Sequence, residues 1–303
     1  MMETVLVSGA TSQLGVFLLP RLMEAGFSVL ALSRRSPEDC VREGVRWLQP
    51  ETETESSAGP QGGERRSVRH LVSCGPLDLA LALVERHSGL QRVVAFSTSS
   101  VVTKVASRNR AEGLHMARIS EDEDRLRERC EKEGVALLLL RPTLIYGCGL
   151  DRNISLLAQF GKRFGVIPLA GKAAGLRQPV HADDLAAVAV SALLAEKAVH
   201  LAGVACGGST LGYGEMAERI ATACGGVRTL AVPPAILSTL VRMATVLPAF
   251  RGVNAEMVRR QSIDMVFDDK TLRSLLDYQP RPFDPRPEDF EIPPKAARFQ
   301  PGP

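Results

Sequence analysis

The sequence predicts an α/β protein: a Rossmann-type, doubly wound parallel sheet with a smaller, mostly helical C-terminal substrate subdomain. A glycine-rich turn at residues 9–15 follows the first apolar run and opens a helical pattern. Short apolar runs rich in β-branched residues then alternate with helical patterns up to about residue 150. Beyond that point helical patterns and proline-rich connections dominate. Such alternation is typical of a parallel sheet with helices on both faces.

The first βαβ unit is expected to consist of a strand at Thr4–Ser8, a helix at 16–25 and a strand at Ser28–Leu32. Gly26 ends the helix. Further strands are expected at 70–73, 92–97 and 135–140, and further helices at 77–85, 121–133, 153–162, 184–195, 214–224 and 269–276. The polar stretch 51–67 is expected to be an exposed loop.

The 303 residues are expected to divide into three parts. These are an NAD(P)-binding Rossmann domain at 1–150, a substrate subdomain at 151–283 with segments that return to the Rossmann core, and a C-terminal tail at 284–303. The net charge is +3 and 45% of the residues are hydrophobic, as in an ordinary globular protein. Composition therefore gives no reason to expect a nucleic-acid partner.

The distribution of cysteines and apolar runs favours a cytoplasmic protein. The six cysteines lie far apart, without C-x-x-C spacing, and the five histidines show no paired ligand spacing. We therefore expect reduced thiols and no metal site. The chain begins without a basic leader, and no run approaches the ~20 apolar residues of a membrane helix. A stable membrane span is not expected.

The turn Gly9-Ala10-Thr11-Ser12-Gln13-Leu14-Gly15 has the spacing of a dinucleotide-binding turn. Gly9 permits a tight turn after the strand, and Gly15 lets the helix pack closely on the sheet. The N–H groups of the helix start are expected to face a pyrophosphate, because the helix dipole favours negative charge there. The predicted cofactor contacts are Gly9, Thr11, Ser12, Gln13, Leu14 and Gly15. A βα turn without a ligand is the alternative.

Basic residues follow the second predicted strand, in Ser33-Arg34-Arg35. NAD enzymes place an acidic residue here for the ribose 2′-hydroxyl, whereas arginine suits the 2′-phosphate of NADP. The first acidic residue of this segment is Glu38. Ser33, Arg34 and Arg35 are therefore predicted to bind NADP(H), with NAD(H) the less favoured cofactor. A solvated basic turn is the alternative.

Four motifs follow one another: the glycine turn, Phe96–Val101, Leu140–Gly147 (L-R-P-T-L-I-Y-G) and Arg177–Ala186. Together they resemble the extended short-chain dehydrogenase/reductase superfamily, in particular its NAD(P)-dependent nucleotide-sugar epimerase/dehydratase group. The resemblance covers roughly residues 4–280. It implies an NAD(P)-dependent oxidoreductase or epimerase, and its motifs are specific for the superfamily but not for a substrate.

The resemblance also implies roles for particular residues. Ser99 falls at the position of the catalytic serine or threonine, which hydrogen-bonds a substrate hydroxyl or carbonyl oxygen. Asn153 and Arg177 fall near the position where nucleotide-sugar enzymes hold the substrate's phosphates. An ion pair of Arg177 with Asp183 or Asp184 is an equally weighted alternative. Implied contacts of the nicotinamide and its ribose are Ser97, Arg141, Pro142 and Thr143.

The chain departs from the family at the Tyr-x-x-x-Lys pair, in which tyrosine is the general acid/base and lysine lowers its pKa. None of its three tyrosines has a lysine four residues later (Tyr146, Tyr213, Tyr278). Alignment through Glu121 and Glu123 places His115 at the tyrosine position and Ile119 at the lysine position.

Two replacements are open. His115 is a candidate acid/base, because imidazole titrates near neutral pH. Lys104 or Arg118 could supply the positive charge near the ribose. The other interpretation of His115 is an ordinary histidine near a helix start, since exposed histidines are common.

Leu230–Phe250 carries apolar residues in a broad helical stripe. Core or lid packing is the ordinary interpretation, and a lipophilic pocket or contact with a membrane surface are the alternatives. Three functions follow: an oxidoreductase or epimerase for a nucleotide sugar, with non-standard acid/base residues; a ketoreductase or hydroxy-dehydrogenase for a lipophilic substrate such as a sterol or polyprenoid; or a non-catalytic NADP-binding sensor or scaffold. The expected partners are a small-molecule substrate and, as one option, a second copy in a homodimer.

These functions predict different sites. An apolar pocket under the 230–250 segment would favour the lipophilic substrate. A basic cleft around Arg177 would favour the nucleotide sugar. A collapsed pocket over the nicotinamide would favour the sensor.

Overall fold

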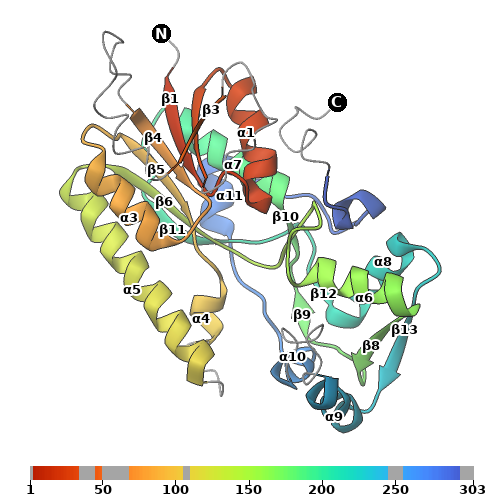
Figure 1. Cartoon of the computed structure of the whole chain (residues 1–303). Coiled ribbons are helices and arrows are strands. Elements are labelled where there is room, and N and C mark those ends of the chain that lie inside the picture. The colour runs from red at the N-terminus through yellow and green to blue at the C-terminus, as the bar shows by residue number, and fades with distance from the viewer. Residues whose placement is uncertain (1–2, 34–44, 50–67, 105–109, 245–254, 294–303) are drawn as a thin grey trace.

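The computed structural model describes residues 3–33, 45–49, 68–104, 110–244 and 255–293 (Figure 1). The larger of its two bodies contains a seven-stranded sheet in the order β11-β6-β5-β4-β1-β2-β3, in which all neighbours are parallel. The strands are β1 (Thr4–Ser8), β2 (Ser28–Leu32), β3 (Val45–Leu48), β4 (Val68–Ser73), β5 (Arg92–Phe96), β6 (Ala136–Pro142) and β11 (Leu201–Ala205). The strand order reverses between β1 and β4, so the predicted doubly wound Rossmann sheet is confirmed.

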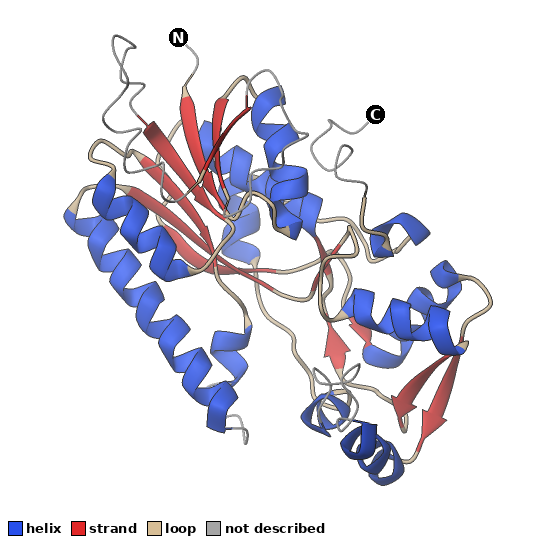
Figure 2. Cartoon of the chain, viewed as in Figure 1, coloured by secondary structure: helices blue, strands red, loops and turns tan. Residues whose placement is uncertain are grey.

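Helices cover both faces of this sheet (Figure 2). One face carries α1 (Gln13–Glu24), α7 (Ala182–Leu194) and α11 (Lys270–Leu276), and the other carries α3 (Leu77–Arg86) and α5 (Arg110–Lys132). Alternate strand residues therefore enter different cores: Val5 and Val7 pack under α1 and α7, and Leu6 packs on the α3 side. Burial on both faces explains why the strands are continuous apolar runs.

A second, smaller body lies beside the carboxyl ends of the strands (Figure 1). Its helices are α6 (Ile154–Phe164), α8 (Tyr213–Cys224), α9 (Pro234–Ala244) and α10 (Ala255–Arg260). Its strands form three pairs: β8 (Val166–Ala170) with β13 (Arg228–Val232), β9 (Leu176–Arg177) with β12 (Leu211–Gly212), and β7 (Ile145–Tyr146) with β10 (Val180–His181). Apolar side chains of α6, α8 and β8 form its core.

The chain passes between the two bodies several times. After α6 and β8 it returns to the large sheet as α7 and β11, and it returns again as α11. The short α4 (Ser100–Lys104) follows β5 directly. Among the described helices, none has both the length and the apolar character needed to cross a bilayer.

Helix α5 and the edge strands β3 and β11 differ from the sequence expectations because tertiary contacts form them; β11 was not expected and forms by pairing along β6. Helix α5 begins at Arg110, eleven residues before the expected start at 121. Its first turns are polar, and an ion pair between Glu112 and Arg260 holds them against α10. Strand β3 was not expected, since its run is only half-buried; it forms by pairing along the edge strand β2.

The C-terminal part also differs from its sequence pattern. The expected helical stripe from Leu230 begins as strand β13, and the helix starts only at Pro234, because Pro233 and Pro234 interrupt the chain. The expected tail contains a 3₁₀ turn at Pro287–Phe290, and Phe290 packs in the core of the smaller body instead of lying on the surface. The expected loop at 51–67 and residues 245–250 lie outside the described residues.

Candidate active site

The glycine turn joins β1 to α1 and requires glycine at both ends. Gly9 has a φ of +64°, and a Cβ there would lie 2.7 Å from the carbonyl carbon of Cys74. A Cβ on Gly15 would lie 2.0 Å from the carbonyl oxygen of Ala10. The turn thus brings the end of β1, the start of α1 and the end of β4 into close backbone contact, as a dinucleotide cradle requires.

Small polar groups surround the start of α1. Ser12 is the N-cap, and its Oγ accepts a hydrogen bond from Gly15 N at 3.3 Å. Its hydroxyl proton is therefore still able to donate. Thr11 Oγ1 and Ser33 Oγ lie 3.4 Å apart, which brings the end of β2 to the turn. The first turn of α1 contains no acidic residue, so its positive dipole end is available to an anion.

Five buried side-chain polar atoms lack a hydrogen-bond partner among the described residues, and two of them are at this site: Gln13 Nε2 in the turn and Ser97 Oγ at the end of β5. A buried polar group without a partner costs about 1–3 kcal/mol, and such groups are commonly satisfied by a ligand or water. Both residues were predicted to contact the cofactor. The turn and these donors fit a nicotinamide dinucleotide.

The predicted nicotinamide-side residues lie next to one another at the carboxyl edge of the sheet. Ser99 N donates to the carbonyl oxygen of Pro142 at 3.0 Å, and Thr143 N donates to that of Ala205 at 3.1 Å. Ser97 N in turn donates to Leu140 O at 2.7 Å. These bonds continue the ladders β5–β6–β11 past the strand ends, so backbone pairing fixes the positions of Ser97, Ser99 and Thr143.

The Arg141 side chain forms an ion pair with a glutamate of α5. Its Nε lies 3.0 Å from both carboxylate oxygens of Glu123, which is almost fully buried. These hydrogen bonds raise the pKa of the Arg141 guanidinium. The Arg141 side chain therefore joins β6 to α5, and its ion pair with Glu123 was not expected from the sequence.

A cavity of 690 Å³ lies between the carboxyl edge of the sheet and the smaller body. Ser99 and Thr143 line it on the sheet side, and Asn153 and Arg177 also line it. Most of its other lining side chains are apolar: Leu144, Ile154, Leu156, Leu157, Phe160, Phe164, Val166, Pro168, Met216, Leu230, Val232, Leu237, Leu240, Val241, Met257, Val258, Met265 and Phe267. The cavity therefore joins four predicted site residues in a mainly apolar space.

Strands β8 and β13 form one wall of this cavity. Leu230 pairs with Pro168 and Val232 with Ala170, in parallel register. Leu230, Val232, Val166 and Pro168 face the cavity, whereas Ile167 belongs to the core behind the wall. The alternation has the period of two residues that a strand imposes. The same alternation in residues 228–232 was the sequence signal for this strand. It was not recognised because the apolar residues on both sides of Pro233 and Pro234 also fit one helical stripe.

The Arg177 guanidinium is held by backbone carbonyls. Its Nη1 donates to the carbonyl oxygens of Leu176 and Ile263, both at 2.7 Å, and its Nη2 to that of Arg260 at 2.6 Å. Its Cζ lies 5.4 Å from the centroid of the Tyr213 ring. Burial lowers the pKa of Arg177, whose exposed fraction is 4%.

The alternative ion pair of Arg177 with Asp183 or Asp184 is wrong. Asp183 is bound by Arg21, at 2.6 Å, and by Arg281, at 2.7 Å. Asp184 is bound by Arg281 as well. Helix α7 therefore turns these carboxylates toward α1 and the C-terminal segment, away from Arg177.

The residues at the predicted tyrosine and lysine positions, and the predicted substrate residue Asn153, lie in different surroundings. His115 is exposed on α5 and is not among the described residues that line the cavity. Ile119, at the lysine position, packs against the core under α3 and α5. Asn153 is exposed, precedes α6, and lines the cavity.

Of the three tyrosines, Tyr213 lines the cavity. Burial raises its pKa to about 12, so its phenol is protonated at neutral pH and is a donor rather than a base. Tyr146 is buried against the rings of His181 and Phe283, and the Tyr278 hydroxyl donates to the carbonyl oxygen of Cys206. Tyr213 is a cavity residue that the motif comparison did not identify.

Three predicted cofactor residues have no described side-chain position. Arg34 and Arg35 lie outside the described residues. Lys104 is the last residue of α4, and only its backbone is described. The predicted preference for NADP(H) therefore depends on the sequence.

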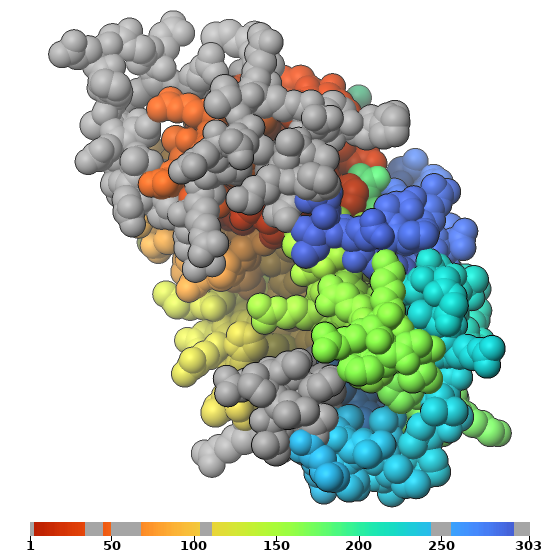
Figure 3. Space-filling view, turned by 45° about the vertical axis from the view of Figure 1, so that its right-hand side comes forward, coloured from red at the N-terminus to blue at the C-terminus, as the bar shows by residue number. Residues whose placement is uncertain are grey.

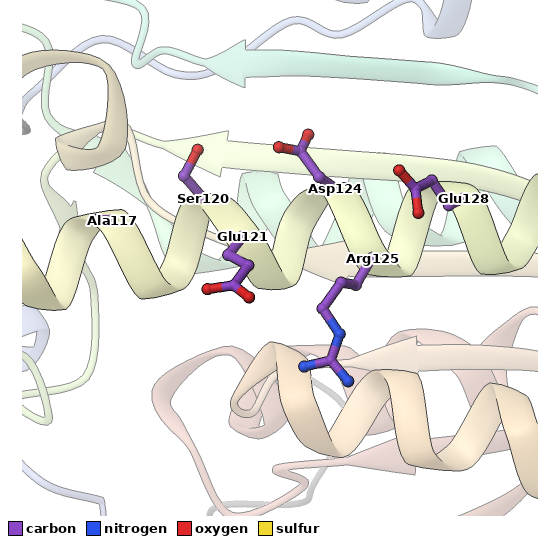
Figure 4. A pocket seen from close by; sticks show the side chains of 6 residues that line it. All are labelled: Ala117, Ser120, Glu121, Asp124, Arg125 and Glu128. Atoms are coloured by element: carbon purple, nitrogen blue, oxygen red, sulfur yellow. The ribbon is translucent and has the colours of Figure 1, made fainter.

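A separate shallow hollow lies on the outer surface of α5 (Figure 4). Its lining comes from this one helix: Ala117, Ser120, Glu121, Asp124, Arg125 and Glu128. Figure 4 shows Ser120, Asp124 and Glu128 in one row and Glu121 and Arg125 in another. These are solvated charges at helical spacing, and the hollow includes none of the predicted site residues.

The fold and the turn define the class: a Rossmann-type protein with a dinucleotide cradle at the switch point of its sheet. No family model matches the sequence, and a comparison with curated proteins finds no match. Similar folds are found among solved structures. UDP-N-acetylglucosamine 4-epimerase from Bacillus cereus is 16% identical, with a TM-score of 0.68 over 95% of this chain and 94% of that one.

Two further structures have similar folds. dTDP-glucose 4,6-dehydratase from Bacillus anthracis, in complex with NAD, is 11% identical, with a TM-score of 0.66 over 98% and 96% of the chains. UDP-glucose 4-epimerase from Thermus thermophilus, in complex with NAD, is 16% identical, with a TM-score of 0.64 over 98% of both chains. The chain therefore has the fold of the NAD-dependent nucleotide-sugar epimerases and dehydratases over nearly its whole length.

Proposed function

We propose that this chain is a cytoplasmic NADP(H)-dependent oxidoreductase that acts on a hydroxyl or keto group of a lipophilic small molecule. The observation that carries the proposal is the 690 Å³ cavity, which extends from Ser99 and Thr143 to the apolar residues of α9. An open apolar pocket beside a dinucleotide cradle is the usual form of a site for a lipophilic substrate.

The residues of the turn would hold the cofactor. The N–H groups at the start of α1 and the Ser12 hydroxyl would bind its pyrophosphate, and Arg34 and Arg35 would bind a 2′-phosphate. Ser97 Oγ and Gln13 Nε2 would gain the partners that they lack among the described residues. When bound, the nicotinamide would supply or accept the hydride.

Ser99 would orient the reacting oxygen. It is buried, it lines the cavity, and its backbone is fixed by its bond to Pro142. A serine hydroxyl can donate to a carbonyl oxygen but is not a base at neutral pH, so proton transfer needs a second group. His115 is proposed for that role on the motif alignment, and Tyr213 is a second proton donor inside the cavity.

The surroundings of Arg177 argue against a diphosphate ligand. Its Nη1 and Nη2 already donate to three carbonyl oxygens, and its guanidinium stacks on Tyr213. A phosphate would have to displace these bonds. A nucleotide-sugar substrate is the second candidate, favoured by the names of the similar structures and by Asn153 at the cavity wall.

The two candidates can be separated with purified protein and NADPH. We expect oxidation of NADPH with a long-chain or polycyclic ketone and none with a UDP-4-keto-hexose. Leu240→Gln, at a half-exposed lining position, should lower kcat/KM for the lipophilic ketone by about tenfold.

Leu275→Gln, equally exposed on α11, is the matched control and should leave the rate unchanged. A rate on the UDP-sugar that is insensitive to Leu240→Gln would support the nucleotide-sugar function. Tight NADPH binding without oxidation by either class of ketone would support the sensor or scaffold function.

A further inference from the structure

Helix α9 is apolar on two faces. Leu237 is buried against Ala170 and Val258, and Val241 lines the cavity beside it. On the adjoining, solvent-facing side Ile236, Leu240 and Met243 have exposed fractions of 53%, 53% and 68%. Ser238, Thr239 and Arg242 form the remaining, polar side of α9, so the helix is amphipathic. Its exposed apolar side is suited to a further apolar surface.

The exposed apolar surface continues into the mouth of the cavity. Phe164 and Leu230 are about half-exposed, and both also line the cavity, as Leu240 does. We call the five residues Phe164, Leu230, Ile236, Leu240 and Met243 the α9 rim. Figure 3 shows the α9 region, in light blue, at the end of the molecule opposite the N-terminal strands.

The polar groups near the α9 rim are basic or internally bonded. Arg163 and Arg228 are exposed on the segments that carry Phe164 and Leu230, and Arg242 is exposed on α9. Residues 228–244 contain no Asp or Glu. The Thr239 hydroxyl donates to the carbonyl oxygen of Ala235 at 2.9 Å, which satisfies it within the helix. An apolar surface bordered by arginines complements an anionic lipid bilayer.

We propose that the α9 rim docks on the surface of an anionic lipid bilayer and opens the cavity toward the acyl region. The proposal rests on the proposed lipophilic substrate, because such a molecule partitions into bilayers and could enter the cavity without crossing water. Ile236, Leu240 and Met243 would enter the headgroup–acyl boundary, and Arg228 and Arg242 would lie at the lipid phosphates.

The test is co-sedimentation of the full chain with vesicles of phosphatidylcholine alone or with about 30 mol% phosphatidylglycerol. We expect binding to the anionic vesicles and weaker binding to the neutral ones. The double variant Ile236→Glu with Met243→Glu should lower binding about tenfold or more, because carboxylates would replace apolar contacts with the bilayer. Both side chains are more than half-exposed and lie outside the cavity lining, so the cavity itself should be unchanged.

Leu194→Glu with Leu275→Glu is the matched control, at exposed fractions of 57% and 53% on other helices, and should bind as the wild type does. Arg228→Gln with Arg242→Gln should lower the affinity for anionic vesicles by about fivefold per arginine and leave neutral vesicles unaffected. Equal binding by the Ile236/Met243 variant and the wild type would overturn the proposal. The proposal would also be overturned if the wild-type protein did not sediment with either vesicle type. It would likewise be overturned if the wild-type protein formed a dimer through the α9 rim and the Ile236/Met243 variant were monomeric.

A kinetic arm separates this proposal from the proposed function. With a short, water-soluble ketone the Ile236/Met243 variant should oxidise NADPH at the wild-type rate, and with a long-chain ketone held in vesicles it should be about tenfold slower. Turnover without vesicle binding would overturn only the docking. Vesicle binding without turnover of any ketone would support the docking and overturn the oxidoreductase.

Discussion

The proposed cofactor side of the site consists of backbone and small polar side chains, whereas the proposed substrate side consists of large apolar side chains from separate segments. Gly9, Ser12 and Ser97 lie within a residue or two of a strand end or helix start. The cavity wall instead combines β8 with β13 and α6 with α9, which are distant in the chain. We therefore expect single substitutions at the few positions of the cofactor side to have large effects. Substitutions at the many apolar positions of the substrate side should each have smaller effects.

The largest expected effect is on the cofactor side. Gly9→Ala should abolish measurable dinucleotide binding, because its Cβ would meet the Cys74 backbone at 2.7 Å and the φ of +64° strains alanine, so the turn that would face the phosphates has to shift. Isothermal calorimetry with NADPH measures it. Gly26→Ala is the control, since Gly26 also has a positive φ but open space around it. Wild-type affinity in Gly9→Ala would place the ligand elsewhere.

The next effect concerns proton transfer. His115→Phe should lower turnover by roughly 10²–10⁴-fold, the usual contribution of a general acid/base, and Ser99→Ala should lower it as well. Both should leave cofactor affinity unchanged, as single-turnover NADPH oxidation and calorimetry would show. Tyr213→Phe is the comparison variant inside the cavity. If the rate is unchanged in His115→Phe and reduced in Tyr213→Phe, the proton donor is Tyr213 and not His115.

Cofactor choice gives a smaller effect. Arg34→Ala should weaken NADP(H) binding by about 1.5–3 kcal/mol, the range for a charged hydrogen bond, and leave NAD(H) nearly unchanged. Titration of the wild type and the variant with both cofactors measures the difference. Equal affinity of the wild type for the two cofactors would contradict the role assigned to Arg34 and Arg35.

The smallest effect is a pH dependence at the contact between α7 and α1. Burial disfavours the Asp183 carboxylate, but the hydrogen bonds from Arg21 and Arg281 hold its pKa below the ordinary value. The unfolded chain therefore binds this proton first, and the stabilisation is present above pH about 4 and is lost as pH falls further. Asp183→Asn should lower the free energy of unfolding by about 1–2 kcal/mol at pH 7 and by less at pH 3, measured by urea denaturation. A constant difference across this range would contradict the assignment.

The accuracy of the sequence predictions follows the same division. Strands β1, β2, β4, β5 and β6 of the large sheet and the turn were predicted closely, since buried parallel strands are continuous apolar runs and the turn is local. The two edge strands β3 and β11, which are less buried, were not predicted. Strand β13 was missed because its wall position depends on pairing with β8, about 60 residues away. The start of α5 was missed because its polar first turns depend on the contact of Glu112 with Arg260.

The sequence by itself determined the Rossmann fold class, the central strands, the glycine turn and the position of Ser99 just after a strand end, because each of these signals is carried by residues within a few positions of one another. The tertiary structure alone decided that Arg177 is bound by three carbonyl oxygens, that Tyr213 reaches the cavity, and that α9 exposes one apolar face. A helical stripe has the same sequence whether it faces a core, a pocket or solvent. Only the packing of distant segments determines which of its faces is covered.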